Sequence, residues 1–98
     1  MKYAVEIDGD ILVWEDGQFK SDNKELLDRI REIESEGNVQ ISLDGSILYS
    51  RGDIKPSSNW ALSYGFLQGL TGGRMKFVAG DRPTWEKLGY KLKEGEIP

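Results

Sequence analysis

Residues 3–14 read Tyr-Ala-Val-Glu-Ile-Asp-Gly-Asp-Ile-Leu-Val-Trp, and the fold prediction starts from them. Apolar side chains alternate before Asp8-Gly9, as in a half-buried strand, and a β-branched and aromatic run follows. An Asp-Gly pair between two such runs predicts a hairpin, because both central residues of its tight turn need positive φ. We therefore expect two antiparallel strands, the second of which ends at residues 15–17.

A helix is predicted next, over residues 22–36. Asp22 is in position to cap its N-terminus, with Glu25 as the second half of a capping box, and Gly37 is in position to end it. Leucines and isoleucines fall on one face of this helix, as in an amphipathic surface helix.

The same pattern then starts again, 36 residues further along the chain. Strands are expected at 39–43 and 47–49 around Asp44-Gly45, a helix at 60–70, a strand at 75–79, a short helix at 83–88 and a last strand at 90–92. The predicted fold is a single α+β domain over residues 1–98 in the order ββα-ββα-β-α, with an antiparallel or mixed sheet and helices packed on one face.

Eight identities at the offset of 36 suggest an internal duplication, and they include the turn, the helix cap and the helix stop. The alternative is that any two hairpin–helix units use the same turn and cap residues.

The composition limits the chemistry. The chain has 98 residues and contains neither Cys nor His, which removes thiol nucleophiles, the commonest general base and the commonest transition-metal ligand. Asp8, Asp10 and Asp44 could hold a hard cation, but Asp is also the residue that such turns prefer. We expect no metal, no cofactor and no enzyme, and an enzyme that uses paired carboxylates ranks last among the functions considered.

The net charge of −4 hides an uneven distribution. Residues 1–37 hold 5 basic and 11 acidic side chains, whereas residues 38–98 hold 8 basic and 6 acidic ones. Net acidity argues against direct binding of nucleic acid. No apolar run is long enough for a signal peptide or a membrane span, so the expected location is the cytoplasm, without membrane contact.

Residues 56–73 contain no charged residue, in a chain that is 31% charged. Their helix is apolar on most sides, and such a helix is normally buried on more than one side. Because a chain of 98 residues has little protein with which to cover more than one side of this helix, we expect an interface in a homodimer or with a partner protein. The alternative is a central core helix covered by the sheet. The predicted interface residues are Trp60, Ala61, Tyr64, Gly65, Gln68 and Gly69.

Basic residues flank this helix, and a helix N-terminus attracts anions. A small anionic ligand such as a nucleotide is therefore the second candidate, with its base stacked on an aromatic ring. The predicted ligand-binding residues are Arg51, Lys55, Ser57, Ser58, Asn59, Trp60 and Arg74. The alternative is ordinary helix capping beside solvated Arg and Lys side chains.

The first prediction is thus a small, non-enzymatic interaction protein, such as an inhibitor or regulator. It would self-associate or dock on a partner protein through the uncharged helix, and its acidic first half would complement a basic partner. The binder of a small anionic ligand is the alternative.

Overall fold

The computed structural model describes residues 1–43, 46–51 and 55–83. Three predictions fall outside these residues: the turn at Asp44-Gly45, the short terminal helix and the last strand. Within the described residues, no helix is both long enough and apolar enough to cross a membrane.

Three consecutive strands form an antiparallel meander. They are β1 (Lys2–Ile7), β2 (Asp10–Glu15) and β3 (Gln18–Ser21). Two-residue turns join them, and both turns have the sequence Asp-Gly. In Asp8-Gly9 the φ angles are 49° and 91°, and in Asp16-Gly17 they are 48° and 89°. Positive φ at both positions gives the turn the twist that a tight hairpin requires.

A fourth strand completes this sheet from the other end of the chain. β6 (Lys76–Gly80) pairs antiparallel with β1, so the strand order is β3-β2-β1-β6. The register shifts between Ala4 and Val5. On the outer face of the sheet, the ammonium groups of Lys2 and Lys20 bond to Glu15, and these bonds lower the pKa of its carboxyl group.

The remaining elements lie between β3 and β6 in the sequence. They are α1 (Lys24–Ser35), β4 (Asn38–Leu43), β5 (Ser46–Arg51), the short 3₁₀ helix η1 (Pro56–Ser58) and α2 (Trp60–Thr71). β4 and β5 form a separate antiparallel hairpin. Both α-helices start at an asparagine cap. The Asn23 side chain accepts the N–H of Leu26 at 3.1 Å, and the Asn59 side chain accepts the N–H groups of Ala61 and Leu62 at 3.0 and 3.1 Å.

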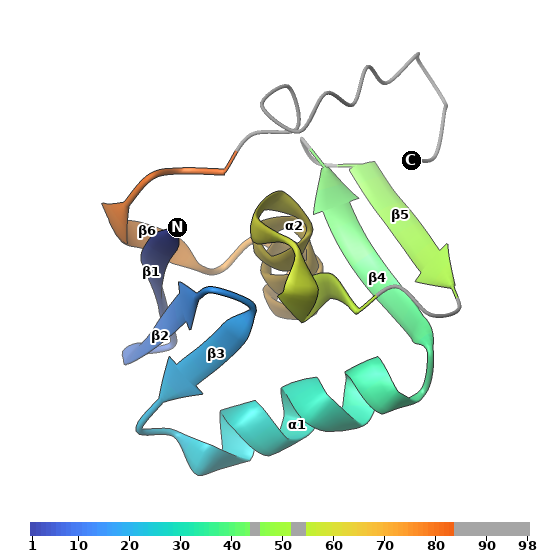
Figure 1. The fold of residues 1–98 in the computed structure, drawn as a ribbon, viewed down its shortest axis with the longest axis horizontal. Coiled ribbons are helices and arrows are strands. Elements are labelled where there is room, and N and C mark those ends of the chain that lie inside the picture. The colour runs from blue at the N-terminus through green and yellow to red at the C-terminus, as the bar shows by residue number, and fades with distance from the viewer. Residues whose placement is uncertain (44–45, 52–54, 84–98) are drawn as a thin grey trace.

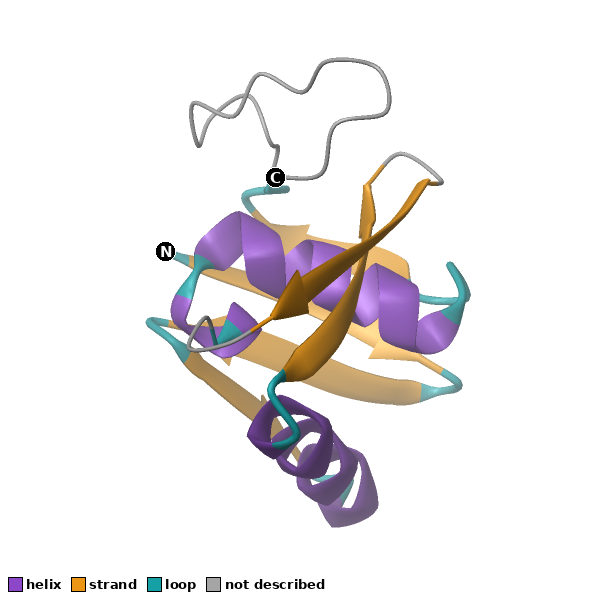
Figure 2. Ribbon diagram, turned by 90° about the vertical axis from the view of Figure 1, so that its right-hand side faces the viewer, coloured by secondary structure: helices purple, strands orange, loops and turns teal. Residues whose placement is uncertain are grey.

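α2 is the middle one of three layers. The four-stranded sheet covers one side of α2, and the β4–β5 hairpin covers the other (Figures 1 and 2). α1 does not lie on the sheet face beside α2; it runs along the β3 end of the molecule and contacts β3 and β4 (Figure 1).

The core lies between the sheet and α2. The ring of Tyr3 stacks on Trp14 with centroids 5.7 Å apart, and it meets Tyr64 of α2 edge-on at 5.5 Å. The Ser63 hydroxyl donates to the carbonyl of Trp60 at 2.7 Å, so the Tyr3 hydroxyl is the donor in its 2.6 Å bond to Ser63 Oγ. Burial raises the pKa of Tyr3 above its usual range. On the far side of α2, Val39 and Ile41 of β4 are buried.

The α+β class predicted from the sequence is confirmed, but the predicted packing of the helices on one face is wrong, since α1 lies at the β3 end of the molecule (Figure 1), and the predicted order is incomplete. It lacks β3 and η1, because the second Asp-Gly pair does not end the sheet; it turns the chain into a third strand. The predicted cap of the first helix is wrong by one residue: Asn23 caps α1, and Asp22 does not.

The two halves share their layout at the offset of 36 residues. β1 and β2 pair from Lys2↔Glu15 to Ile7↔Asp10, and β4 and β5 pair in the same register, from Asn38↔Arg51 to Leu43↔Ser46. The bounds of α1 and α2 are also 36 residues apart. The halves differ after the hairpin, where one has β3 and the other η1.

Candidate functional site

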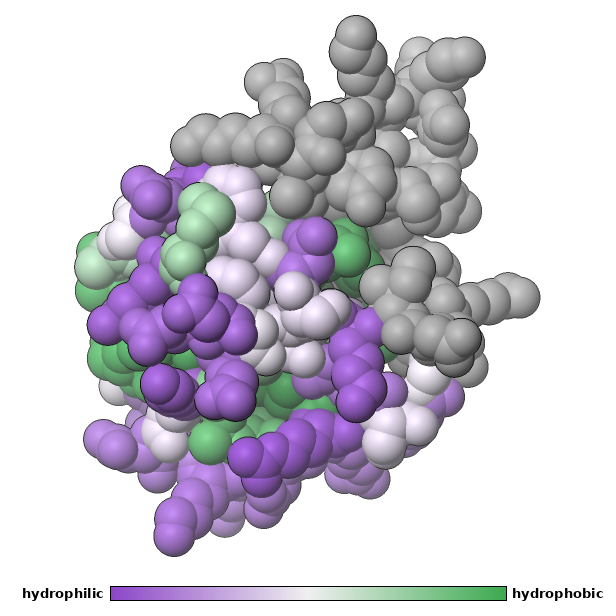
Figure 3. Space-filling model, viewed as in Figure 1, coloured by the Kyte–Doolittle hydropathy of each residue, from purple (hydrophilic) through white to green (hydrophobic). Residues whose placement is uncertain are grey.

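A cleft of about 380 Å³ lies between α1, the start of β3 and the segment that enters η1. Its lining is mixed: Phe19, Leu27 and Ile30 contribute buried and half-buried apolar side chains, Glu34 and Ser57 contribute half-buried polar ones, and Gln18 at the rim is exposed. Figure 3 shows apolar surface between β3 and α1, bordered by hydrophilic side chains. The lining residues are Gly17, Gln18, Phe19, Leu27, Ile30, Arg31, Glu34, Lys55 and Ser57.

Ser57 joins the walls of the cleft. Its hydroxyl and its backbone N–H both donate to Glu34 Oε2 of α1, at 2.7 and 3.3 Å. Its carbonyl accepts the indole N–H of Trp14, from β2, at 2.7 Å. Two side chains from different elements therefore hold η1 in place, and the Glu34 carboxylate already has two donors.

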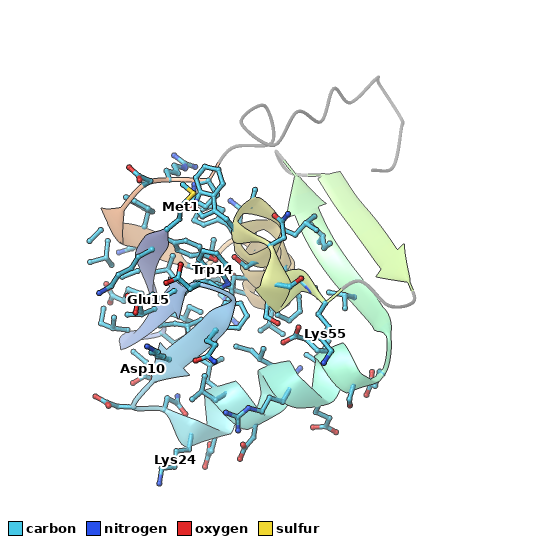
Figure 4. All side chains as sticks on the ribbon, viewed as in Figure 1. Met1, Asp10, Trp14, Glu15, Lys24 and Lys55 are labelled. Atoms are coloured by element: carbon cyan, nitrogen blue, oxygen red, sulfur yellow. The ribbon has the colours of Figure 1, made fainter. Side chains whose placement is uncertain are left out.

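Two cationic side chains, both exposed, stand at the rim. Arg31 lies 3.8 Å from Asp28, an exposed pair that is worth well under 1 kcal/mol. The Lys55 ammonium makes no ion pair with any residue that the structure describes, and Lys55 lies above α1 in the view of Figure 4. Both cations are thus available to an anion in the cleft.

The structure brings together part of the ligand-binding set predicted from the sequence. Lys55 and Ser57 both line the cleft. Ser58 is exposed, and its hydroxyl donates to the carbonyl of Lys55 at 2.6 Å. The side-chain oxygen of Asn59 is used in capping α2, and Trp60 is buried in the core.

The two predicted arginines are not part of this group. Arg74 follows the other end of α2, and twelve helical residues separate the two ends by about 18 Å. There its Nε donates to the carbonyl of Thr71 at 2.8 Å, and its guanidinium lies 3.7 Å from Asp8. The side chain of Arg51 lies outside the described part of the structure.

The residues predicted to form an interface lie mostly inside the molecule. Trp60, Ala61, Tyr64 and Gly65 are buried, and Gln68 and Gly69 are half-buried. The sheet and the β4–β5 hairpin cover α2 within one chain, so the apolar circumference of this helix needs no second chain to explain it. An interface on α2 stays a prediction, with Gln68 and Gly69 as its accessible part.

Arg31, Phe19 and the other residues of the α1 and β3 walls were not predicted from the sequence. One signal was present: Asp16-Gly17 repeats the turn sequence of Asp8-Gly9, and Phe19 alternates with polar neighbours after it. Arg31 gave no comparable signal, because a basic residue on a mixed-charge helix is usually solvated.

The carboxylates considered as cation ligands have other partners. Asp8 is in a turn and lies near Arg74, and Asp10 accepts a bond from Asn23 at 2.8 Å. Asp44 lies outside the described residues. Among the residues that the structure describes, no group of three or more acidic side chains is placed to hold a metal ion.

Comparison of the chain with family models, with curated proteins and with solved structures gave no match, so the geometry of the cleft carries the functional argument.

Proposed function

We propose that the chain binds a small molecule in the cleft between α1, β3 and η1, and that this ligand joins an anionic group to a flat apolar body. The observation that carries the proposal is the pair of cations, Arg31 and Lys55, at the rim of a cleft that also contains the apolar side chains of Phe19, Leu27 and Ile30. Among the described residues that line the cleft, Glu34 is the only carboxylate, and it accepts hydrogen bonds from Ser57, so it opposes an incoming anion less than a free carboxylate would.

The size and lining suit a ligand such as a mononucleotide. The volume of about 380 Å³ lies at the lower end of the range for small-molecule pockets, roughly 300–1,000 Å³. A phosphate or carboxylate group would lie between Arg31 and Lys55, which provide charge-assisted hydrogen bonds. An aromatic body would pack on Phe19 and Leu27, which are half-buried and therefore still accessible.

Binding without catalysis fits this lining better than an enzyme. Acid–base chemistry with carboxylates uses two of them in different environments. The cleft residues include one, Glu34, and its hydrogen bonds to Ser57 serve to hold η1. A regulatory or inhibitory role and a cytoplasmic location remain proposals from the sequence.

Calorimetric titration tests the proposal, with nucleoside monophosphates, inorganic phosphate and the uncharged nucleosides as probes. A nucleoside monophosphate should bind more tightly than inorganic phosphate or the uncharged nucleoside. The cations at the rim would contact its phosphate, and the apolar side chains of the cleft would contact its base. Arg31→Gln and Lys55→Gln should each weaken binding about tenfold, as expected for the loss of one charge-assisted bond of about 1.5 kcal/mol.

Matched controls are available on the same surface. Lys24 and Arg29 are exposed cations of α1 that do not line the cleft, so Lys24→Gln and Arg29→Gln should leave the affinity unchanged. Equal losses in all four variants would show non-specific attraction to positive charge, and no measurable binding of any probe would overturn the proposal.

Docking of a partner protein through α2 has less support, because only the side of α2 near Gln68 and Gly69 is accessible.

We also propose that the two halves are duplicated units. The equal strand registers and helix bounds at the offset of 36 support this. On this proposal the cleft forms where corresponding segments meet, since Phe19 and Lys55 occupy equivalent positions.

A further inference from the structure

The two carboxylate oxygens of Glu34 have different partners. Oε2 accepts the hydroxyl and the backbone N–H of Ser57, at 2.7 and 3.3 Å. Within residues 1–43, 46–51 and 55–83, no donor bonds to Oε1, and the nearby cation Arg31 pairs with Asp28 at 3.8 Å instead. An ionised carboxylate accepts at both oxygens, so Oε1 keeps its capacity to accept a hydrogen bond in the cleft.

Glu34 stands close to the place proposed for the anionic group of the ligand. Leu27, Arg31 and Glu34 all line the cleft, and their spacing of four and three residues puts them on one face of α1 over about 10 Å. Arg31 and Glu34 are neighbours on this face, one turn apart. A phosphate held by Arg31 and Lys55 therefore brings the sugar attached to it close to Glu34.

A ligand in the cleft would shield Glu34, which is already half-buried, from water. A carboxylate oxygen that loses water without gaining a donor weakens binding, whereas a ligand group that donates to it avoids this cost. A site of this kind rejects an analogue that lacks the donor. A hydroxyl fits Oε1 better than an ammonium group does, because Arg31 and Lys55 repel a further cation.

We propose that Glu34 Oε1 accepts a hydrogen bond from a sugar hydroxyl, so that the cleft selects ribonucleotides over 2′-deoxyribonucleotides. The selection rests on the proposed function, because the cleft must first bind a nucleotide. Glu34 thereby has two roles: Oε2 holds η1 through Ser57, and Oε1 reads the sugar. In dinucleotide-binding sites an acidic side chain accepts a ribose hydroxyl in the same way.

Calorimetric titration with adenosine monophosphate and its 2′-deoxy form tests the proposal. The wild-type protein should bind the ribonucleotide about tenfold more tightly, as expected for one hydrogen bond to a charged group. Glu34→Gln should lose this preference, because its one side-chain oxygen is used by Ser57 and its amide nitrogen donates but does not accept. It should bind the 2′-deoxy form at least as tightly as the wild type does, since one negative charge is gone.

Two control variants should keep the preference. Glu32 is an exposed carboxylate of α1 that does not line the cleft, so Glu32→Gln should behave like the wild type. Ser57→Ala removes the hydroxyl that bonds to Oε2 but leaves Oε1 in place. Because the two nucleotides share the same base and phosphate, the ratio of their affinities isolates the hydroxyl even where a variant loosens η1.

The outcomes separate this selection from the binding on which it rests. Equal affinities of the wild-type protein for the two nucleotides would overturn the selection and leave the proposed function standing. A preference that survives Glu34→Gln would assign the hydroxyl to another group and overturn the role of Glu34. Absence of binding by either nucleotide would overturn both proposals.

Discussion

Gly80 lies at a position where the surrounding backbone leaves no room for a side chain. Its φ is +100°, and a Cβ built on it would meet the backbone of β1, within 2.7 Å of the Tyr3 Cα and closer still to the Lys2 carbonyl oxygen. Both atoms belong to the backbone at the start of β1, where Tyr3 is paired with Gly80 itself, so neither can move without disturbing the β1–β6 pairing.

Gly80→Ala should therefore cost about 2–3 kcal/mol of the free energy of unfolding, from backbone strain together with the clash. Gly73→Ala is the matched control. Gly73 has a φ of +82° but open space around it, so this variant should lose only about 1–2 kcal/mol. Urea denaturation measures both values, and equal losses would mean that the clash with β1 contributes nothing.

An asparagine caps each of the two α-helices, so the contributions of the two caps to stability can be compared. Asn59→Ala should cost about 1–2 kcal/mol of stability, and Asn23→Ala about 0.5–1 kcal/mol, within the usual range for N-caps. The difference is expected because the first turn of α2 is packed in the core, whereas the first turn of α1 is largely exposed.

Thermal and urea denaturation of the two alanine variants test this order. Asn59→Asp, which keeps an acceptor at the cap, should retain most of the wild-type stability. A larger loss for Asn23→Ala than for Asn59→Ala would contradict the central position of α2.

Elements with their own local signal could be predicted from the sequence. The first hairpin, both helices and β6 followed from alternation, Asp-Gly and glycine stops. β3 did not, because four residues of alternation are short and Asp16-Gly17 marks the end of a strand as well as a turn. The environment of α2 also could not be predicted, because the sequence of an uncharged helix does not show whether a sheet of its own chain or a second chain covers it.

The cleft is a property of the whole molecule and was only partly predictable. Its walls come from β3, α1 and the entry to η1, three segments that are separate in the sequence. Lys55 and Ser57 were found because they lie near a helix N-terminus, which is a local feature. Arg31 and Phe19 join them only through the packing of α1 against β3.

The pH dependence of the free energy of unfolding depends on Tyr3 of β1, whose buried hydroxyl is hydrogen-bonded to Ser63 of α2. In the folded protein, burial raises the pKa of Tyr3, whereas in the unfolded chain it is about 10. The unfolded state therefore loses this proton first. The contribution of Tyr3 is complete below pH 10 and is lost as the pH rises above it, by up to about 1.4 kcal/mol per pH unit.

Tyr3→Phe should remove this contribution. Its free energy of unfolding should fall less steeply than that of the wild type between about pH 9.5 and 11. Urea denaturation at several pH values measures the two slopes, in which the other titrating groups are common to both proteins. Parallel slopes would contradict a buried, protonated Tyr3 in the folded state.

The pairing of β1 with β6 also governs how the chain can fold during synthesis. Ala4 lies opposite Ala79, so the sheet cannot close until nearly all of the described chain has left the ribosome. Contacts between residues so distant in sequence make folding slow. Until then, the apolar helix α2 lacks its full cover, so its uncharged surface is exposed for longer in the nascent chain than in the folded protein.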